Sequence, residues 1–263
     1  MKLLLSSGIG YRTHTLKELS ALVESVGMHG LELNLPPRNR PTSETTRDTD
    51  YKGIPNILAI HAPGDTYDLP RFTKALEDTL AVANAEHIPL INIHPASLAY
   101  GGRKTVQSAI ELIKKAQRST TATICYEILV DPNGLAPDRI EHFKKQQAYY
   151  SIEEYLADIK EHNLPSTLDT AHLGTYGITN VSEWIEKFSP QLTHVHLSNY
   201  SKAQTKEHLP VNEGDVDLTT FLQTLQKTHP NITVTTELHP LDTREDVEQT
   251  IKETAKFIKN ALS

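Results

Sequence analysis

Short apolar runs alternate along the chain with longer stretches in which apolar residues recur at helical spacing. The runs are rich in Leu, Ile, Val or Thr and are bounded by Pro, Gly or Asn, which is typical of strands. They predict strands at 2–7, 30–35, 56–61, 90–94, 122–129, 166–170, 192–197 and 232–238. The stretches between them predict helices at 16–26, 70–85, 104–118, 151–161, 182–188, 218–227 and 244–261. The longer connection from 131 to 150 predicts a loop that enters a helix.

Strands that alternate with helices predict a parallel sheet joined by crossover helices. A doubly wound open sheet would alternate in the same way. Two observations favour a closed barrel: eight strands are predicted, and no glycine-rich phosphate fingerprint follows the first one. The length of 263 residues suits a (β/α)8 barrel, which takes about 250 residues. We therefore predict a single α/β domain over 1–263, a (β/α)8 TIM barrel.

The ends of six successive predicted strands carry residues that commonly bind metals. These residues are His61, His94, Glu127, Asp169, His196 and Glu237. Since side chains alternate between the two faces of a strand, each residue two positions earlier shares its face. That face is small or polar, with Ala59, Asn92, Cys125, Thr167, His194 and Thr235, whereas the intervening positions are mostly apolar. The six residues therefore belong to the inward face at the C-terminal rim, where active sites of this fold lie.

Four of these residues form the predicted first shell of a metal ion, Glu127, Asp169, His196 and Glu237. Carboxylates and imidazole without cysteine suit Mn, Mg, Co, Fe or Zn. Such an oxygen-rich site leaves positions open for substrate oxygens, so that a sugar with adjacent carbonyl and hydroxyl groups could chelate the ion. The metal would stabilise an enediolate, and Glu127 or Glu237 would carry the proton. One polar residue at a strand end is more often a cap, but six in succession favour a metal site.

Other polar residues leave alternatives open. His172 follows Asp169 by three residues, so it could bend back over the pocket to bind a substrate oxygen or a second metal, or cap the next helix. His208 lies in a predicted loop at 207–215, where it is a further ligand, a substrate contact or a solvated residue. His194 lies two residues before His196 on the same face, so we expect it to contact a metal ligand and not the metal itself. Glu32, inside the second strand, is either a partner of a rim group or paired within the barrel.

Composition and charge narrow the class of protein. The net charge of −7 disfavours a nucleic-acid partner, because phosphate-binding proteins usually carry a basic face. The lone cysteine, Cys125, allows no internal disulfide, and we interpret it as a small core residue. The apolar run at 3–5 is too short for a signal peptide, and no stretch approaches the roughly 18 apolar residues of a membrane span. We expect a cytoplasmic protein without a membrane partner, and a homo-oligomer is compatible with the sequence.

With these residues in place, the chain resembles the xylose-isomerase-like barrel superfamily over nearly its whole length. This group includes sugar epimerases and isomerases such as tagatose 3-epimerase, together with hydroxypyruvate isomerase, inosose dehydratase and the endonuclease IV repair enzymes. The resemblance is carried by 60–64 (IHAPG), 93–97 (IHPAS), 125–129 (CYEIL), 169–172 (DTAH), 194–196 (HVH), 212–215 (NEGD) and Glu237. Each motif is short, but their order and spacing are typical of the superfamily.

The epimerase branch implies one metal, held by residues matching Glu127, Asp169, His196 and Glu237. In that branch the two glutamates exchange protons with the substrate carbon from opposite sides, and the residue matching His172 touches substrate. The sequence Glu127-Ile128-Leu129 is more similar to this branch than to the repair branch, where asparagine commonly follows the glutamate.

The repair branch implies three zinc ions, with further ligands that match His61, His94, His172 and His208. It also needs an aspartate two residues before the last histidine, where this chain has Lys206. That departure puts the third metal in doubt, although a two-metal site remains open.

The function predicted from these features is a divalent-metal-dependent isomerase or epimerase of a small sugar or sugar phosphate. The metal is Mn, Co, Mg or Fe, and the reaction proceeds through a metal-stabilised enediolate. One alternative is an endonuclease IV-like zinc phosphodiesterase acting on abasic DNA, and another is a dehydratase of a keto-sugar or cyclitol, which begins with the same proton abstraction. Substrate or a second metal is predicted to be bound by four histidines, His61, His94, His172 and His208.

Overall fold

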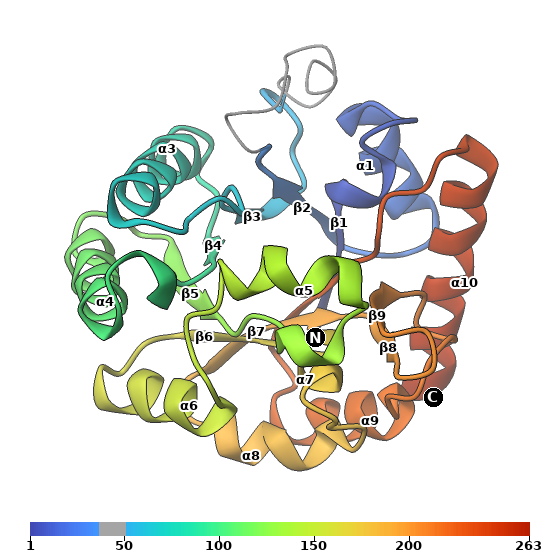
Figure 1. The fold of residues 1–263 in the computed structure, drawn as a ribbon. Coiled ribbons are helices and arrows are strands. Elements are labelled where there is room, and N and C mark those ends of the chain that lie inside the picture. Colours follow the sequence, from blue (N-terminus) through green and yellow to red (C-terminus); the bar gives the residue numbers. More distant parts are fainter. Residues whose placement is uncertain (37–50) are drawn as a thin grey trace.

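The computed structural model describes residues 1–36 and 51–263, in which parallel strands close into a barrel (Figure 1). The barrel strands are β1 (Lys2–Ser6), β2 (Gly30–Asn34), β3 (Ile57–His61), β4 (Leu90–Ile93), β5 (Thr123–Glu127), β6 (Ser166–Asp169), β7 (Leu192–Leu197) and β10 (Thr233–Thr236). They pair in this order, and β10 pairs with β1 to close the ring. The predicted fold class, a single (β/α)8 barrel, is confirmed.

Helices surround the barrel. The outer ring in Figure 1 contains α1 (Leu16–Ser25), α3 (Leu69–Glu86), α4 (Arg103–Gln117), α6 (Ile152–Glu161), α8 (Trp184–Phe188), α9 (Leu218–Thr228) and α10 (Arg244–Leu262). Two shorter helices are α5 (Pro137–Lys144) and α7 (Thr170–Thr175), and α7 follows β6 directly. In the view of Figure 1, α5 lies across the front of the barrel. Among the described residues, no helix is both long enough and apolar enough to cross a membrane.

Local sequence explains where several helices begin. Thr15 caps α1 by accepting a hydrogen bond from the Glu18 amide, and the Glu18 carboxylate accepts one from the Thr15 amide. This reciprocal capping box satisfies amides that the first helical turn leaves without partners. Asp68 caps α3 in a similar way, with a proline in the first turn, where the missing N–H costs nothing.

The core has two layers, one outside the strands and one inside. Outward-facing residues of β3 to β7 are fully buried against the helices in one large cluster, with Ile60, Ile91, Ile124, Leu168 and Val195 among them. Leu5 of β1 and Leu31 of β2 belong to a smaller cluster with residues of α1 and α10. Inside the barrel, a small apolar layer is formed by Leu4, Ala59, Leu90 and Cys125. Burial raises the pKa of the Cys125 thiol far above its usual range, which agrees with its interpretation as a core residue.

The structure differs from the sequence prediction at two connections. The segment 131–150, predicted as a loop that enters a helix, contains a 3-10 turn (Pro132–Gly134) and a helix of its own, α5. The predicted loop at 207–215 begins within a strand, β9 (Lys206–Leu209), which pairs antiparallel with β8 (Asn199–Ser201). Both elements are short additions to the repeating strand–helix pattern, so the periodicity that reveals the barrel does not reveal them.

Candidate metal and substrate site

The ligand-type residues lie at the C-terminal ends of the barrel strands, as predicted. His61, Glu127 and Asp169 are the last residues of β3, β5 and β6. His196 lies in β7, one residue before its end, and is fully buried. His94 and Glu237 follow β4 and β10 by one residue each. Parallel closure therefore gathers all six side chains at one rim.

The Nδ1 atom of His196 is the point around which the predicted first shell meets. It lies 2.7 Å from Glu237 Oε2, 3.3 Å from Glu127 Oε1 and 3.7 Å from Asp169 Oδ2. Glu127, Asp169 and His196 are fully buried. Three carboxylates and one imidazole nitrogen thus converge on a small volume.

Two further histidines contact the same cluster. The Nε2 atoms of His61 and His94 lie 3.3 Å and 3.4 Å from Glu127 Oε2. Candidate ligand atoms of His61, Glu127, His196 and Glu237 all lie within 4.8 Å of one another. This group of four therefore has His61 in the place of Asp169, the residue that the sequence pattern predicts.

Asp169 belongs to a second, neighbouring group with His172 and His208, whose candidate ligand atoms also lie within 4.8 Å of one another. Its Oδ1 accepts a hydrogen bond of 2.7 Å from the His172 amide. Its Oδ2 is buried and has no hydrogen-bond partner among the residues that the structure describes. Because an unpaired buried carboxylate oxygen is costly, this atom fits a site that binds a cation.

The electrostatics of the cluster also favour a cation. Burial alone would raise the pKa of Glu127 and Glu237, but the positive charge of His196 holds both well below their usual range. Burial would lower the pKa of His61, yet its hydrogen bond and charge interactions with Glu127 raise it to about 9. The carboxylates are therefore ionised, and protonated imidazoles balance them in the absence of a metal. A divalent ion would displace these protons, since metal ligands must be deprotonated.

Asn92 of β4 supports Glu127 from within the barrel. Its side-chain amide donates a short hydrogen bond to Glu127 Oε2, and its carbonyl oxygen accepts one of 2.6 Å from the Thr167 hydroxyl. This buried chain fixes the orientation of the carboxylate. The sequence pattern predicts that Asn92 and Thr167 lie on the inward face but indicates no role for them.

His172 and His208 face each other above the cluster. The Nδ1 of His172 donates to the Ile128 carbonyl at 2.7 Å, which leaves its Nε2 directed at His208 Nε2, 3.2 Å away. His208 lies on β9 with a φ of 51°, in the left-handed region that non-glycine residues rarely adopt. Strain of this kind clusters at functional sites, so it supports a role for His208 in the pocket.

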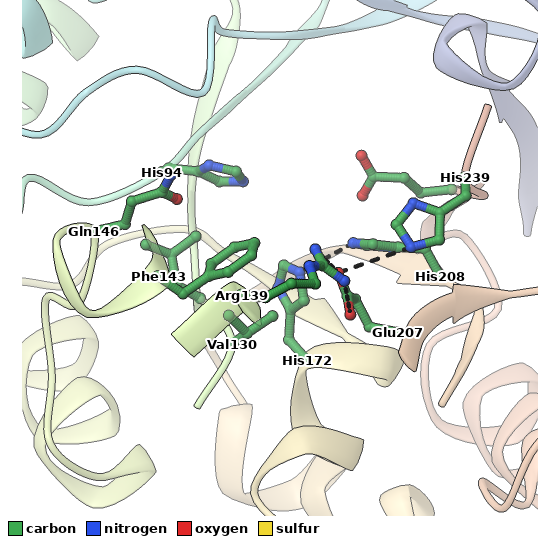
Figure 2. Close-up of a pocket in the computed structure, with 11 residues that line it drawn as sticks. His94, Val130, Arg139, Phe143, Gln146, His172, Glu207, His208 and His239 are labelled. Atoms are coloured by element: carbon green, nitrogen blue, oxygen red, sulfur yellow. Dashed lines mark hydrogen bonds and ion pairs between the residues drawn. The ribbon is translucent and has the colours of Figure 1, made fainter. Parts of the chain in front are cut away.

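A cavity of about 190 Å³ opens above these histidines (Figure 2). Its lining joins rim residues to side chains from α5 and from the β8–β9 hairpin: His94, Leu129, Val130, Arg139, Phe143, Gln146, His172, Glu207, His208, Glu237 and His239. Pockets for drug-sized ligands usually measure about 300 to 1,000 Å³. The cavity therefore suits a small molecule.

One wall of the cavity carries an ion pair that the sequence analysis missed. Arg139 of α5 contacts both carboxylate oxygens of Glu207 on β9, at 2.5 Å and 2.8 Å, as the dashed lines in Figure 2 show. His239 Nε2 lies 3.8 Å from the same carboxylate. Burial lowers the pKa of His239 to about 4, so the ring is neutral near pH 7.

Of Arg139, Glu207 and His239, the last two lie beside residues that the sequence pattern had singled out. His239 follows Glu237 by two residues, and Glu207 directly precedes His208. Arg139 had no such signal in the sequence, because it belongs to a helix that the sequence pattern did not predict.

Comparisons with known proteins agree with this fold. A family model described as xylose isomerase-like TIM barrel matches residues 11–261. No curated protein matches the sequence.

Similar solved structures exist at low sequence identity. A D-allulose 3-epimerase from Methylomonas sp. is 14% identical with a TM-score of 0.71, and 100% of this chain and 98% of that chain are covered. An L-ribulose 3-epimerase is 15% identical with a TM-score of 0.70, with 99% and 94% covered. The IolI protein with a binding zinc atom is 14% identical with a TM-score of 0.67, with 99% and 96% covered. At these identities the likeness shows the fold.

Proposed function

The chain belongs to the xylose isomerase-like TIM barrel family, and from this premise we propose that it is a divalent-metal-dependent isomerase or epimerase of a small sugar. The observation that carries the proposal is the convergence of Glu127, Asp169 and Glu237 on the Nδ1 atom of His196. The similar structures include an L-ribulose 3-epimerase and a D-allulose 3-epimerase, and these names support a sugar as the substrate here.

Glu127, Asp169, His196 and Glu237 would hold the ion, with His61 as a further donor, because its candidate ligand atom lies within 4.8 Å of those of Glu127, His196 and Glu237. When bound, the ion supplies a positive charge that stabilises negative charge developing on the substrate oxygens. Mn, Co, Mg and Fe all suit this donor set. The orphaned Asp169 Oδ2 and the ionised glutamates are the features of the chain that fit such an ion.

The two glutamates carry out the proton transfer in this proposal. One carboxylate accepts the proton of the C–H bond beside the substrate carbonyl, and the electron pair of that bond moves toward the carbonyl oxygen. The other glutamate must begin this step as the carboxylic acid; it gives its proton to the opposite face of the same carbon, which inverts that carbon, and is left as the carboxylate. If the proton is delivered to the former carbonyl carbon instead, and the adjacent hydroxyl gives its proton to the former carbonyl oxygen, the carbonyl moves by one carbon. Between C1 and C2 this is an aldose–ketose isomerisation.

The remaining lining residues bind and orient the sugar. Asn92 holds Glu127 in one orientation by donating to Oε2, while Oε1 faces His196 Nδ1 at 3.3 Å. His172, whose Nδ1 is held by a backbone carbonyl, directs Nε2 toward the cavity and is placed to contact a substrate hydroxyl. The Arg139–Glu207 pair closes one side of the cavity and presents N–H groups to hydroxyl oxygens.

A zinc phosphodiesterase is the second candidate, because Asp169, His172 and His208 form a second group of metal-ligand types. The IolI structure with its zinc atom is compatible with zinc in this fold. The net charge of −7 and Lys206 in the place of an aspartate count against abasic DNA as the substrate. A keto-sugar or cyclitol dehydratase would use the same first proton abstraction as the isomerase.

The proposal is tested by counting metals and then by assay. Protein purified without chelator is analysed by elemental mass spectrometry and incubated with a panel of free and phosphorylated ketoses. About one Mn, Co, Fe or Mg per chain, together with interconversion of a ketose, supports the isomerase or epimerase. Two or three zinc ions per chain with cleavage of abasic DNA or phosphoesters would replace it with the second candidate. A dehydrated product would indicate the dehydratase. The cytoplasmic location stays a prediction from the sequence.

A further inference from the structure

We propose that Glu32 is the positioning residue that orients His196 for metal binding, by accepting a hydrogen bond from its Nε2–H. The inference rests on the proposed metal-dependent function. It concerns a residue that lies inside the barrel, away from the residues that line the cavity.

Glu32 reaches His196 across the barrel interior. It lies on β2, whereas His196 lies on β7, and β1 and β10 stand between these strands in the ring. The carboxylate oxygens of Glu32 lie 3.2 Å and 3.3 Å from His196 Nε2. The neighbour of Glu32 on β3 is Ala59, whose small side chain leaves room for a carboxylate in the interior.

The contact selects one tautomer of His196. A carboxylate at this position can only accept, so Nε2 must carry a proton. The lone pair of the neutral ring is then on Nδ1, the nitrogen that faces Glu127, Asp169 and Glu237. In the opposite tautomer, a lone pair on Nε2 would face the Glu32 carboxylate, and Nδ1 could not bind a cation.

The burial of Glu32 also supports a role as the hydrogen-bond acceptor of His196. Its side chain is fully buried, and an ionised carboxylate in that environment is expensive unless it is paired and hydrogen-bonded. Within the described part of the chain, Glu32 is the acceptor found at His196 Nε2, and His194 Nε2 lies 3.5 Å from the same carboxylate. Histidines that bind metals usually donate their other ring N–H to a carboxylate or carbonyl, and loss of that partner typically weakens metal binding about 10- to 100-fold.

Thr235 offers a matched control. It is a buried barrel residue whose hydroxyl contacts His194 Nε2 at 2.8 Å, and that contact does not include His196. Thr235→Val removes a polar contact from the same interior without removing the acceptor of His196. Because Thr235 is the register partner of His196 on β10, the variant reports what a disturbance directly beside His196 does to metal binding while Glu32 is kept.

The experiment compares Mn²⁺ affinity by isothermal titration in chelator-treated wild type, Glu32→Gln and Thr235→Val. Glutamine is nearly isosteric but lacks the charge, and its amide can turn to donate a hydrogen bond that favours the wrong tautomer. We expect affinity to fall about 10- to 100-fold in Glu32→Gln and to change less than about threefold in Thr235→Val. Equal losses of affinity in the two variants, or no loss in Glu32→Gln, would overturn the inference. If wild-type protein still binds Mn²⁺, the proposed function would stand in either case.

A measurement on the wild type makes the test independent of how well the variants fold. In ¹⁵N-histidine-labelled protein loaded with Zn²⁺, we expect NMR to show His196 with a proton on Nε2 and the metal on Nδ1. A metal on Nε2 would overturn the inference. If wild-type protein binds neither Mn²⁺ nor Zn²⁺, the proposed function fails, and the role of Glu32 fails with it.

Discussion

Two groups of residues at the mouth of the barrel differ in origin. We call Glu127, Asp169, His196 and Glu237 the rim cluster, and Arg139, Glu207 and His239 the mouth wall. Glu237 and all three residues of the mouth wall line the cavity. The cluster comes from the ends of barrel strands, and three of its four members are fully buried. The mouth wall comes from α5, the β8–β9 hairpin and the loop after β10, and the side chains of Arg139 and His239 are about one-third exposed, at 31% and 33%.

This difference separates chemistry from selection. Barrel strands are held by ladders of backbone hydrogen bonds, so they position reacting groups with little freedom. Added loops and helices vary without disturbing the barrel, and in this fold they usually set which substrate enters. We therefore expect changes in the rim cluster to reduce the chemical step and changes in the mouth wall to reduce substrate binding.

The largest expected effect is that of Glu237→Gln. The amide cannot accept a proton, so kcat should fall about 10²- to 10⁴-fold on a ketose found by the panel. Metal content, measured by elemental mass spectrometry, should fall only modestly, because an amide oxygen still coordinates. The matched change in the mouth wall is His239→Gln, two residues further along, for which we expect a raised KM. Full activity in Glu237→Gln would show that Glu237 does not transfer the proton.

Metal removal should destabilise the protein through the rim cluster. A ligand that binds only the folded state adds about 2.7 kcal/mol to the free energy of unfolding at 100 times its Kd. Dialysis against EDTA should therefore lower the Tm, and Mn²⁺ should restore it. Asp169→Asn should reduce this Mn²⁺-dependent shift, whereas Arg139→Ala should keep it. A shift of equal size in wild type and Asp169→Asn would place the metal outside the cluster.

Arg139→Ala tests the mouth wall directly. We expect KM to rise about tenfold with kcat changed less than severalfold, because the guanidinium lies on the cavity wall and not beside the reacting carboxylates. Loss of the partner of buried Glu207 should cost about 1 to 3 kcal/mol in the free energy of unfolding, measured by urea denaturation. A double-mutant cycle with Glu207→Gln separates the pair from the single changes. If kcat falls as far as in Glu237→Gln, the division between chemistry and selection is wrong.

The smallest expected effect is at an exposed ion pair that does not line the cavity, Arg244 with Glu18 at 2.8 Å. The hydrogen bond from Arg244, with those from Thr15, lowers the pKa of Glu18 from 4.5 to about 2. Since the folded-state pKa is the lower one, the stabilisation is fully present above pH 4.5 and is lost as pH falls toward 2. Glu18→Gln should keep the capping box but flatten this part of the pH dependence, measured as urea midpoints from pH 7 to pH 3. An unchanged slope would show that the pair contributes nothing, as many exposed pairs do.

Much of the barrel and of the rim cluster follows from the sequence alone. Strand residues alternate between two faces, and each strand ends within a few residues of its Pro, Gly or polar boundary, so both properties are local. The inward position of His61, Glu127 and Asp169 at the rim could therefore be predicted before any contact was known. The same local reasoning assigned Cys125 to the core.

Only the tertiary structure decided which of these side chains meet. The convergence on His196 Nδ1, the reach of Glu32 from β2, and the pairing of Arg139 with Glu207 join residues that lie far apart in the sequence. Such contacts depend on the tilt and stagger with which the strands close, which set the level of each side chain inside the barrel. Local periodicity predicts which face of a strand a residue occupies. It does not predict the level of that residue along the barrel axis or its partner across the barrel. It also missed α5 and β9, which lie outside the strand–helix repeat and supply the mouth wall.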